Sequence, residues 1–500
     1  MLFNSFIFIL LFLPVTLLGT FFINRYISRR AAIIWLLSAS LFYYGYDDHR
    51  YTILIIMSMA FNYIVGSIIV NDIVYKGRSY TKTLLIFGVA CNLALLGYFK
   101  YANFFIENID KIFNIHAQVL EVLLPIGISF YTFQQIAYLV DSYRKLTKGY
   151  NLFDYCLFVV FFPQLIAGPI VHHKEMITQF KNKQAFKFLP ENFSEGFSMF
   201  SIGLLKKVIL ADGIAQYANP VFNYAGTGGH VSFLVAWLGA LAYTFQIYFD
   251  FSGYSDMAIG LGRMLGVRLP VNFNSPYKAN NIIDFWRRWN MTLSRFLKEY
   301  LYFALGGNRK GKLRRYINLM LTMILGGLWH GASWTFVFWG GLHGAYLCVN
   351  HAWVIVKKQF GMSEQSGQLF KMFSKLITFL SVVIAWVFFR ASTFSSAFNM
   401  IKGMFGFNGL ALPTGYSTQL YFGAQELVFI AILFLIILFL PNSQQFVSKN
   451  FLGKVTDGNV LSAELAMNKV NIGWAILFSL AFVFCLLFTV TPASFIYFRF

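Results

Sequence analysis

Long apolar stretches recur along almost the whole chain, and they constrain its fold more than any other feature. A helix that crosses a lipid bilayer needs about 20 mainly apolar residues, and several of these stretches reach that length. Hydrophobic residues make up 58% of the 500 residues and charged residues only 12%, a composition far from that of soluble proteins. The sequence therefore predicts an all-α, polytopic integral membrane protein with roughly 10 to 13 membrane helices. The apolar stretches cover approximately residues 3–24, 32–46, 51–72, 83–99, 120–140, 152–171, 232–250, 316–338, 339–356, 371–390, 424–441 and 472–490.

The first apolar stretch is followed by basic residues, which sets the predicted orientation. It has no positive charge before it and no small-residue cleavage pattern after it, so we expect a retained helix and not a secretory signal. Arg25, Arg29 and Arg30 come next, and the positive-inside rule then places the N-terminus outside and this loop in the cytoplasm. The next loops agree with this alternation, with Asp47 and Asp48 outside, Lys76, Arg78 and Lys82 inside, and Arg144, Lys145 and Lys148 inside.

The net charge of +20 follows mainly from this topology. Lys and Arg residues sit in short loops between the apolar stretches and form no separate basic domain, which argues against nucleic-acid binding. His172 and His173 are adjacent, so on a helix their side chains would point about 100° apart. The cysteines lie inside apolar stretches and lack the spacing of a metal site or a disulfide framework. We therefore expect no metal site; the four cysteines are Cys91, Cys156, Cys348 and Cys485.

One apolar stretch, 152–171, does not fit the simple alternation. Basic residues flank it on both sides, with Lys148 before it and Lys174 after it. It either spans the membrane against the charge rule, with an ordinary proline kink, or enters the membrane and returns. Pro163 and Pro169 favour a break, because proline removes an amide donor and disfavours helix at the preceding residue. Broken backbone at membrane depth is tolerated only where protein or a water-filled cavity covers it.

No internal repeat stands out, and we expect a single integral membrane domain over residues 1–500. Its main soluble pieces are the loops near 172–192, 268–315, 357–370 and 443–471. The loop 268–315 is strongly basic toward its end, where Glu299 is the single acid. Its apolar residues recur at helical spacing, which predicts amphipathic helices in the cytoplasmic interface. The basic residues are Arg287, Arg288, Arg295, Lys298, Arg309, Lys310, Lys312, Arg314 and Arg315.

Two interpretations of this basic loop stay open. It could bind the phosphates of a cytoplasmic donor such as coenzyme A, or it could hold a lipid-anchoring helix under the ordinary positive-inside bias. Composition alone favours the second interpretation.

A histidine lies inside the apolar stretch 316–338, in the run Gly326–Trp334 (GGLWHGASW). At about 1.5 Å of rise per residue, a helix that starts after Arg315 would place His330 about 22 Å along its axis. That depth lies inside a hydrocarbon layer about 30 Å thick, where an ionisable side chain usually marks a functional site. His330 is therefore the candidate catalytic residue. Taken alone, it could equally be a structural histidine.

Three further polar residues lie near membrane depth. His343 follows His330 by about 19 Å of rise and 140° of rotation on an unbroken helix. The two histidines should therefore have separate roles unless the chain turns at Gly340 and Gly341. We expect a structural His343, hydrogen-bonded between helices. Asp250 and Asp256 could line an ion or proton path. The favoured alternative places them at a helix end, with Gly253 marking the break, paired to a basic residue or capping a helix.

Four ordered blocks of the sequence resemble the membrane-bound O-acyltransferase family. They are Leu124–Gln134 (LPIGISFYTFQ), Phe162–Ile170 (FPQLIAGPI), Phe285–Trp289 (FWRRW) with Leu305–Arg309 (LGGNR), and Leu328–Gly331 (LWHG). The chain is most similar to the bacterial alginate O-acetyltransferase type, including its ending at Phe495–Phe500 (FIYFRF). The signature core would cover about 120–350.

This resemblance implies an acyl-transfer enzyme whose family-essential histidine corresponds to His330. It also implies membrane, re-entrant and interfacial helices around a central tunnel, between a cytoplasmic donor and an acceptor on the other side. The chemistry suits the residue, because a neutral imidazole can take the proton of an attacking hydroxyl near neutral pH. Gly326, Gly327 and Gly331 would let the backbone approach the site closely.

The chain departs from this bacterial branch at one position. After FWRRW the branch commonly has a second histidine, whereas this chain has Asn290. Asparagine cannot act as a base, but it could orient the donor carbonyl or stabilise developing charge, as the Asn and His pair of eukaryotic members suggests. The predicted catalytic pair is therefore His330 with Asn290. The candidate donor-binding residues are Arg287, Arg288 and Arg309.

The resemblance further implies an O-acetyltransferase of the bacterial inner membrane that modifies a secreted or cell-envelope polysaccharide. Alginate, cellulose and peptidoglycan stay possible acceptors, and acetyl-CoA or an acyl carrier thioester would be the donor substrate, with no permanently bound cofactor. Expected partners are membrane lipid and a separate periplasmic or extracellular acetyltransferase.

Two other functions stay open. In a transporter or flippase, Asp250, Asp256 and His330 would form a relay and the break in 152–171 a gate, although we see no matching halves. An assembly scaffold that keeps the fold without catalysis is the third function.

Overall fold

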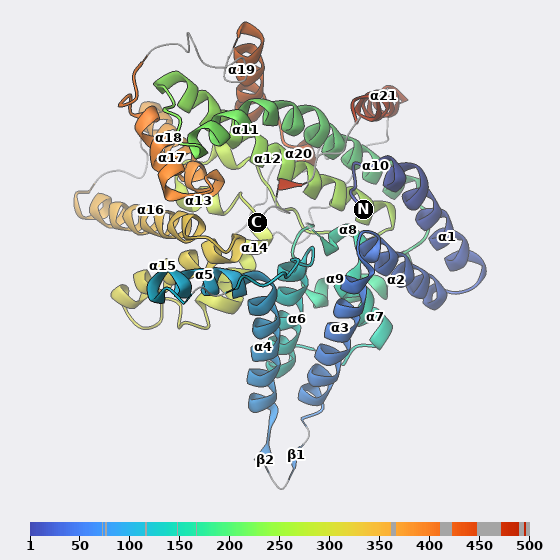
Figure 1. Cartoon of the computed structure of the whole chain (residues 1–500). Coiled ribbons are helices and arrows are strands. Elements are labelled where there is room, and N and C mark those ends of the chain that lie inside the picture. Colours follow the sequence, from blue (N-terminus) through green and yellow to red (C-terminus); the bar gives the residue numbers. More distant parts are fainter. Residues whose placement is uncertain are drawn as a thin grey trace. The chain divides into compact units, whose positions relative to one another are not determined.

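The computed structural model describes most of the chain, and Figure 1 shows it coloured along the sequence. Lys76, Lys148, most of the loop 443–471 and most of the ending 495–500 lie outside the described residues. The described residues are 1–72, 74–75, 78–115, 118–147, 149–166, 168–361, 367–410, 423–447, 472–489 and 495–496.

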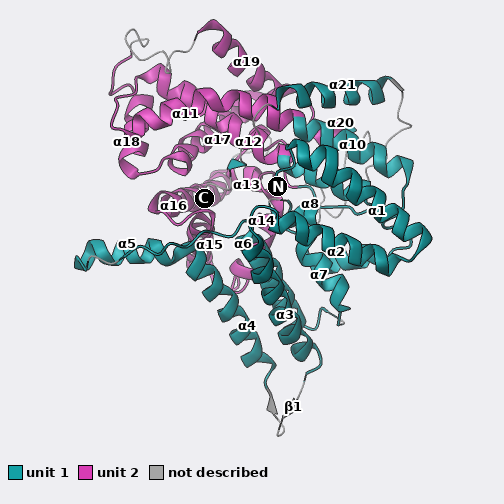
Figure 2. Cartoon of the chain, turned by 45° about the vertical axis from the view of Figure 1, so that its right-hand side comes forward, with its two compact units in different colours: residues 1–204, 254–271, 447–498 teal, residues 205–253, 272–446, 499–500 magenta. Residues whose placement is uncertain are grey.

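The chain divides into two compact units (Figure 2). Unit 1 comprises Met1–Leu204, Tyr254–Val271 and Val447–Phe498, and unit 2 comprises Leu205–Gly253, Asn272–Phe446 and Arg499–Phe500. The long helix α12 (Phe233–Met264) contributes residues to both. The expectation of one integral membrane domain stays a prediction.

Unit 1 holds the N-terminal helices and the only β-strands among the described residues. The two short strands are antiparallel, with Val74 opposite Ser79 and Tyr75 opposite Arg78. The elements are the π-helical turn η1 (Phe8–Phe12), α1 (Leu13–Tyr26), α2 (Arg29–Gly45), α3 (His49–Val70), β1 (Val74–Tyr75), β2 (Arg78–Ser79), α4 (Thr81–Leu96), η2 (Gly97–Tyr101), α5 (Ala102–Phe113), α6 (Ile128–Tyr143), α7 (Leu152–Val160), α8 (Phe162–Leu165), α9 (His173–Phe180), α10 (Pro190–Leu205) and α21 (Ile472–Phe488).

Helices α3, α4 and α6 pack against one another in unit 1 through buried amide side chains. Asn92 Nδ2 donates to Asn62 Oδ1 at 2.7 Å, and Asn62 Nδ2 donates to both Asn92 Oδ1 and Gln135 Oε1. Such hydrogen bonds hold helices together, because the amide groups would otherwise lie unpaired in apolar surroundings. The amides therefore fix how these three apolar helices pair.

Unit 2 holds the predicted catalytic residues. Its elements are η3 (Lys206–Ala211), α11 (Asp212–Gly226), the first part of α12, η4 (Pro276–Lys278), α13 (Ile282–Trp286), α14 (Met291–Phe296), η5 (Leu297–Tyr302), α15 (Lys312–His330), α16 (Trp334–Gln359), α17 (Gln368–Arg390), α18 (Phe394–Met404), α19 (Ala424–Phe439) and α20 (Ser443–Val447).

The hairpin of α15 and α16 is the most extensive helix pair of unit 2. It is close because glycines lie where the two backbones meet. A Cβ atom on Gly327 would collide with the carbonyl oxygen of Phe336, and one on Gly340 would collide with that of Met323. Small residues let helix backbones approach in this way, so these glycines place the end of α15 beside α16.

The all-α, polytopic class is confirmed. Within the described residues, five helices are long and apolar enough to cross a membrane, while α2 with 17 residues and α6 with 16 are shorter. The five are Phe8–Tyr26, His49–Val70, Thr81–Phe113, Phe233–Met264 and Gln368–Arg390, with shorter apolar helices at Ala424–Phe439 and Gly473–Phe488. The count of roughly 10 to 13 membrane helices and the central tunnel stay predictions.

The stretch 152–171 is broken, and the break comes before Pro163. Helix α7 ends at Val160, Phe161 adopts φ −52° and ψ 107°, and α8 begins at Phe162. Nine residues of α7 rise only about 13 Å, less than half of a hydrocarbon layer about 30 Å thick. A single spanning helix with a proline kink is therefore wrong for this stretch.

The basic loop 268–315 forms short amphipathic helices, as its apolar spacing predicts. Phe285, Trp289, Leu293 and Phe296 are buried along α13, α14 and the residues between them, while Arg287 is exposed. The helical pattern is thus confirmed for this loop.

Candidate active site

His330 is the last residue of α15, and it is only 4% exposed. The helix stops there because Gly331 adopts an extended conformation. Ser333 then starts α16, its side chain accepting a hydrogen bond from the Thr335 amide. The chain turns at residues 331–333 and not at Gly340 and Gly341, which lie inside α16.

This position has an electrostatic consequence. The C-terminal end of a helix carries partial negative charge, which favours a nearby cation. The negative end of the α15 dipole therefore lies at His330.

Aromatic rings surround His330. The ring of His330 lies 4.9 Å from Trp329, 5.1 Å from Trp339 and 5.2 Å from Phe389, measured between ring centroids. Trp339 and Phe389 are each 1% exposed. The imidazole is therefore enclosed by rings on elements α15, α16 and α17, which keep bulk water away from it.

His343 lies in the same aromatic cluster. Its ring is 4.8 Å from Trp339, 5.1 Å from Trp286 and 6.1 Å from Phe285. Among the described residues, neither ring nitrogen of His343 has a hydrogen-bond partner. The expected interhelical hydrogen bond is therefore not found, and Trp339 contacts both histidines because the turn after Gly331 brings α16 back along α15.

Asn290 is buried at the start of α14, with only 2% of its surface exposed. Its backbone adopts φ 40° and ψ 56°, a left-handed conformation that asparagine tolerates better than most residues. Asn272 stabilises this turn with two oxygens. Its backbone carbonyl accepts from the Met291 amide at 3.0 Å, and its Oδ1 accepts from the Thr292 hydroxyl at 2.9 Å. Among the described residues, Asn290 Nδ2 has no hydrogen-bond partner.

A row of tryptophans borders both predicted catalytic residues. Trp339, which contacts His330, stacks on Trp386 at 5.7 Å, and Trp386 lies 4.8 Å from Trp289, the neighbour of Asn290 in the chain. Ring contacts thus lead from His330 through Trp339 and Trp386 to Trp289, the residue before Asn290 in the chain. Neither the row nor the turn after Gly331 was predicted.

The three arginines proposed for donor binding differ in their surroundings. Arg288 Nε donates to Asp284 Oδ1 at 2.7 Å, a pair within α13 and its end. Arg287 and Arg309 are exposed and form no ion pair with a carboxylate of the described residues. Arg288 is thus paired within the loop and the other two are not, and donor binding stays a prediction for all three arginines.

The carboxylate of Asp250 is held by a buried lysine. Lys207 Nζ lies 2.6 Å from Asp250 Oδ1 and 2.8 Å from Asp212 Oδ1. This pairing agrees with the favoured structural interpretation of Asp250. The predicted break at Gly253 is wrong, because α12 continues from Phe233 to Met264. Asp256 is buried in unit 1.

No group of three or more His, Cys, Asp or Glu side chains within the described ranges is placed to hold a metal ion. The rings that surround His330 are instead indole and phenyl groups. The imidazole can accept a proton, the indole N–H groups can donate hydrogen bonds, and the rings exclude water. Acyl transfer by general-base catalysis uses these three properties.

Comparison with known proteins supports the same chemistry. The sequence model of the membrane-bound O-acyltransferase family matches residues 98–389. A peptidoglycan O-acetyltransferase of Helicobacter pylori is 46% identical over 438 residues, which are 82% of this chain and 81% of the relative. The probable alginate O-acetylase AlgI of Pseudomonas aeruginosa is 42% identical over 413 residues, 81% of this chain and 75% of the relative. A teichoic acid D-alanyltransferase of Streptococcus thermophilus is 25% identical over 280 residues, 53% of this chain and 68% of the relative.

The family match covers more than half of the chain and includes both Asn290 and His330. The resemblance noted in the sequence motifs is thereby confirmed. With its apolar helices and this match, the chain is a multi-pass membrane acyltransferase and belongs to the membrane-bound O-acyltransferase family.

Proposed function

We propose that this protein is an O-acetyltransferase that passes acetyl from a cytoplasmic thioester across the membrane, for O-acetylation of a secreted or cell-envelope polysaccharide. The observation that carries the proposal is His330, buried at the end of α15 among three aromatic rings. The relatives named peptidoglycan O-acetyltransferase and alginate O-acetylase support acetyl as the group and a polysaccharide as the acceptor.

In the proposed reaction, His330 is the general base. Its neutral imidazole takes the proton of an acceptor hydroxyl while the hydroxyl oxygen attacks the thioester carbonyl. A carbon–oxygen bond forms, the carbon–sulfur bond breaks, and the proton passes from the imidazolium to the leaving thiolate. The negative end of α15 favours the imidazolium between these two proton transfers.

Buried donors of unit 2 suit a carbonyl or hydroxyl ligand. Trp286 Nε1, Trp339 Nε1 and Asn290 Nδ2 are buried and have no hydrogen-bond partner among the described residues. Buried polar groups in proteins are nearly always partnered. We therefore assign Asn290 the role of donating to the oxygen of the thioester carbonyl, where negative charge develops during attack.

The donor would meet the exposed basic residues of the loop 268–315. Arg287 and Arg309 are the residues that we propose for the phosphates of acetyl-CoA or of an acyl carrier, since Arg288 is committed to Asp284. Guanidinium groups bind phosphate oxygens strongly because they present two parallel N–H donors. The thioester acts as a substrate, and we propose no permanently bound cofactor.

The charge pattern supports a location in the bacterial inner membrane with the N-terminus outside. Alginate, cellulose and peptidoglycan are the proposed acceptor classes, and a separate periplasmic or extracellular acetyltransferase is the proposed partner that completes the transfer.

Membrane vesicles test the proposal. We would supply radiolabelled acetyl-CoA or an acetylated acyl carrier protein and measure label in membrane-embedded and extracellular acceptor. Wild type is compared with His330→Ala at matched protein levels, and with His49→Ala as a control because His49 is exposed at the start of α3.

The expected result is transfer that is lost in His330→Ala and retained in His49→Ala. The donor that supports transfer identifies the thioester, and the labelled fraction identifies the acceptor class. Transfer at the wild-type rate in His330→Ala would overturn the assignment of the base.

A further inference from the structure

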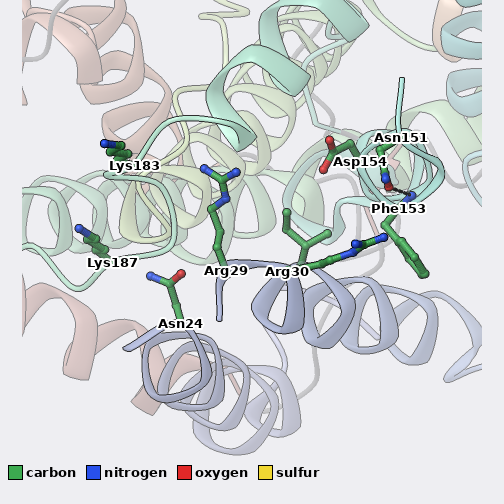
Figure 3. A pocket seen from close by; sticks show the side chains of 9 residues that line it. Asn24, Arg29, Arg30, Asn151, Phe153, Asp154, Lys183 and Lys187 are labelled. Carbon is green, nitrogen blue, oxygen red and sulfur yellow. Dashed lines mark hydrogen bonds between the residues drawn. The ribbon is translucent and has the colours of Figure 1, made fainter. Parts of the chain in front are cut away.

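A basic pocket in unit 1 plays no part in the proposed chemistry. Its volume is about 530 Å³, and three segments far apart in the sequence form it: the end of α1 with the start of α2, the start of α7, and the loop after α9. Figure 3 shows the side chains that line it. They are Asn24, Arg29, Arg30, Ile33, Asn151, Phe153, Asp154, Lys183 and Lys187.

Four cations and one carboxylate line this pocket. Arg29, Arg30, Lys183 and Lys187 are exposed, and none of them pairs with a carboxylate of the described residues. In Figure 3, Arg29 lies between the two lysines and Asp154, while Arg30 extends toward Phe153. The guanidinium carbon of Arg30 is 5.7 Å from the Phe153 ring centroid. The pocket therefore concentrates positive charge, which the single carboxylate of Asp154 offsets only in part.

The helix dipole does not explain why two arginines lie at the start of α2. Arg29 and Arg30 occupy the first turn of α2, at the positive end of the helix dipole, where a cation is unfavourable by about 0.3–1 kcal/mol. The positive-inside rule accounts for arginines after the first helix. It accounts for lysines in a later cytoplasmic loop as well, but not for the convergence of these lysines and arginines on one pocket.

The loop that carries the lysines is anchored. Phe186, between Lys183 and Lys187, is fully buried, and its amide donates to the Leu265 carbonyl at 3.0 Å. Arg29 Nη1 donates to the Lys181 carbonyl at 2.6 Å, which ties the start of α2 to this loop. The backbone positions of the four cations are therefore set in advance, which lowers the entropy lost when an anion binds.

From this geometry we infer that the pocket binds a phosphate group, carried either by an anionic phospholipid headgroup or by a soluble phosphate ester. Lysine and arginine together suit phosphate oxygens through charge-assisted hydrogen bonds. Ile33 and Phe153 add an apolar border, and the charge alternation predicts a cytoplasmic position for all three segments. Anionic lipid surfaces attract such basic clusters.

Binding to the purified full-length protein tests this inference without any acetyl transfer, so its outcome is separate from that of the proposed function. Labelled short-chain phosphatidylglycerol and labelled pyrophosphate are titrated in a neutral detergent, with phosphatidylcholine as the zwitterionic control. The variant Lys183→Gln/Lys187→Gln removes two exposed pocket charges. The matched control Lys82→Gln/Lys145→Gln removes two exposed charges of the same unit that lie outside the pocket.

We expect the pocket variant to bind about tenfold more weakly and the control to bind like wild type. Asp154→Asn should bind about two- to fivefold more tightly, because it removes the repelling carboxylate. Weakened binding of phosphatidylglycerol alone identifies a lipid headgroup, and equal weakening for pyrophosphate identifies a soluble phosphate. Equal affinities in the pocket variant and the control, or no binding by wild type, would overturn the inference.

Discussion

Two buried histidines, His173 in unit 1 and His330 in unit 2, have very different surroundings. His173 Nε2 lies 3.0 Å from Asp141 Oδ2, and its Nδ1 lies 2.8 Å from the Tyr150 hydroxyl. His330 is bordered by aromatic rings at 4.9 to 5.2 Å. Burial alone therefore does not distinguish a histidine with hydrogen-bonded protein partners from the one predicted to be catalytic. Both ring nitrogens of His173 lie within hydrogen-bond distance of described side chains, and aromatic rings enclose His330.

The largest effect on stability is expected where the hydrogen-bonded histidine is replaced. His173→Phe keeps an aromatic ring but leaves the buried Asp141 without its histidine and Tyr150 without its partner. Breaking a buried pair of this kind costs about 3–5 kcal/mol. Thermal unfolding in detergent measures the loss. An unchanged unfolding temperature would show that the His173 hydrogen bonds contribute little.

The amide of Asn290 should affect the rate more than the fold. Asn290→Gly removes the side chain without straining the left-handed backbone at φ 40°, and loss of one donor to the developing oxyanion lowers the rate about 100-fold. Asn290→His keeps a side-chain donor and should retain more activity. The rate of acetyl transfer at saturating donor measures both. Equal rates in wild type and Asn290→Gly would contradict this role.

Substitutions of the arginines in the loop 268–315 should change either the KM for the donor or the stability of the protein. Arg287→Gln/Arg309→Gln should raise KM for the thioester about two- to fivefold with little change in stability, because both side chains are exposed. Arg288→Gln, which breaks the pair with Asp284, should instead lower the unfolding temperature. Steady-state kinetics with varied donor tests the division, and a KM effect confined to Arg288→Gln would reverse it.

The smallest effect on stability is expected when the other histidine of the aromatic cluster, His343, is replaced by phenylalanine. His343→Phe replaces one ring by another at a place where neither nitrogen has a partner among the described residues, so the change in stability should stay within about 1.5 kcal/mol. Comparison with His173→Phe sharpens the contrast between the two surroundings. A loss as large as that of His173→Phe would show that His343 makes a polar contact of similar strength.

Short-range patterns in the sequence predict most of the helices and the candidate histidine, but they do not predict where the helices end. Apolar stretches predict where helices form, and the LWHG block identifies His330. The helix ends depend on local signals that hydropathy does not contain. Gly127 at φ 75° starts α6 later than the apolar run, and the cap at Ser333 marks the turn after His330.

Pairings between distant residues could not be predicted from one sequence. Lys207 and Asp250 belong to separate elements, as do Asp141 and His173. Trp386 reaches the cluster from α17, and nothing in its local sequence distinguishes it from other apolar residues of that helix. The structure describes the surroundings of His330 and Asn290, and their catalytic roles stay predictions.

Single-turnover transfer of acetyl by the purified full-length protein in vesicles tests the central claim most directly, with His330→Gln compared with wild type and with His49→Gln. If His330 is the general base, the rate constant in His330→Gln falls about 10²- to 10⁴-fold while donor binding is unchanged. His49→Gln transfers at the wild-type rate. A His330→Gln rate close to that of wild type, in protein that unfolds at the same temperature, would contradict the account.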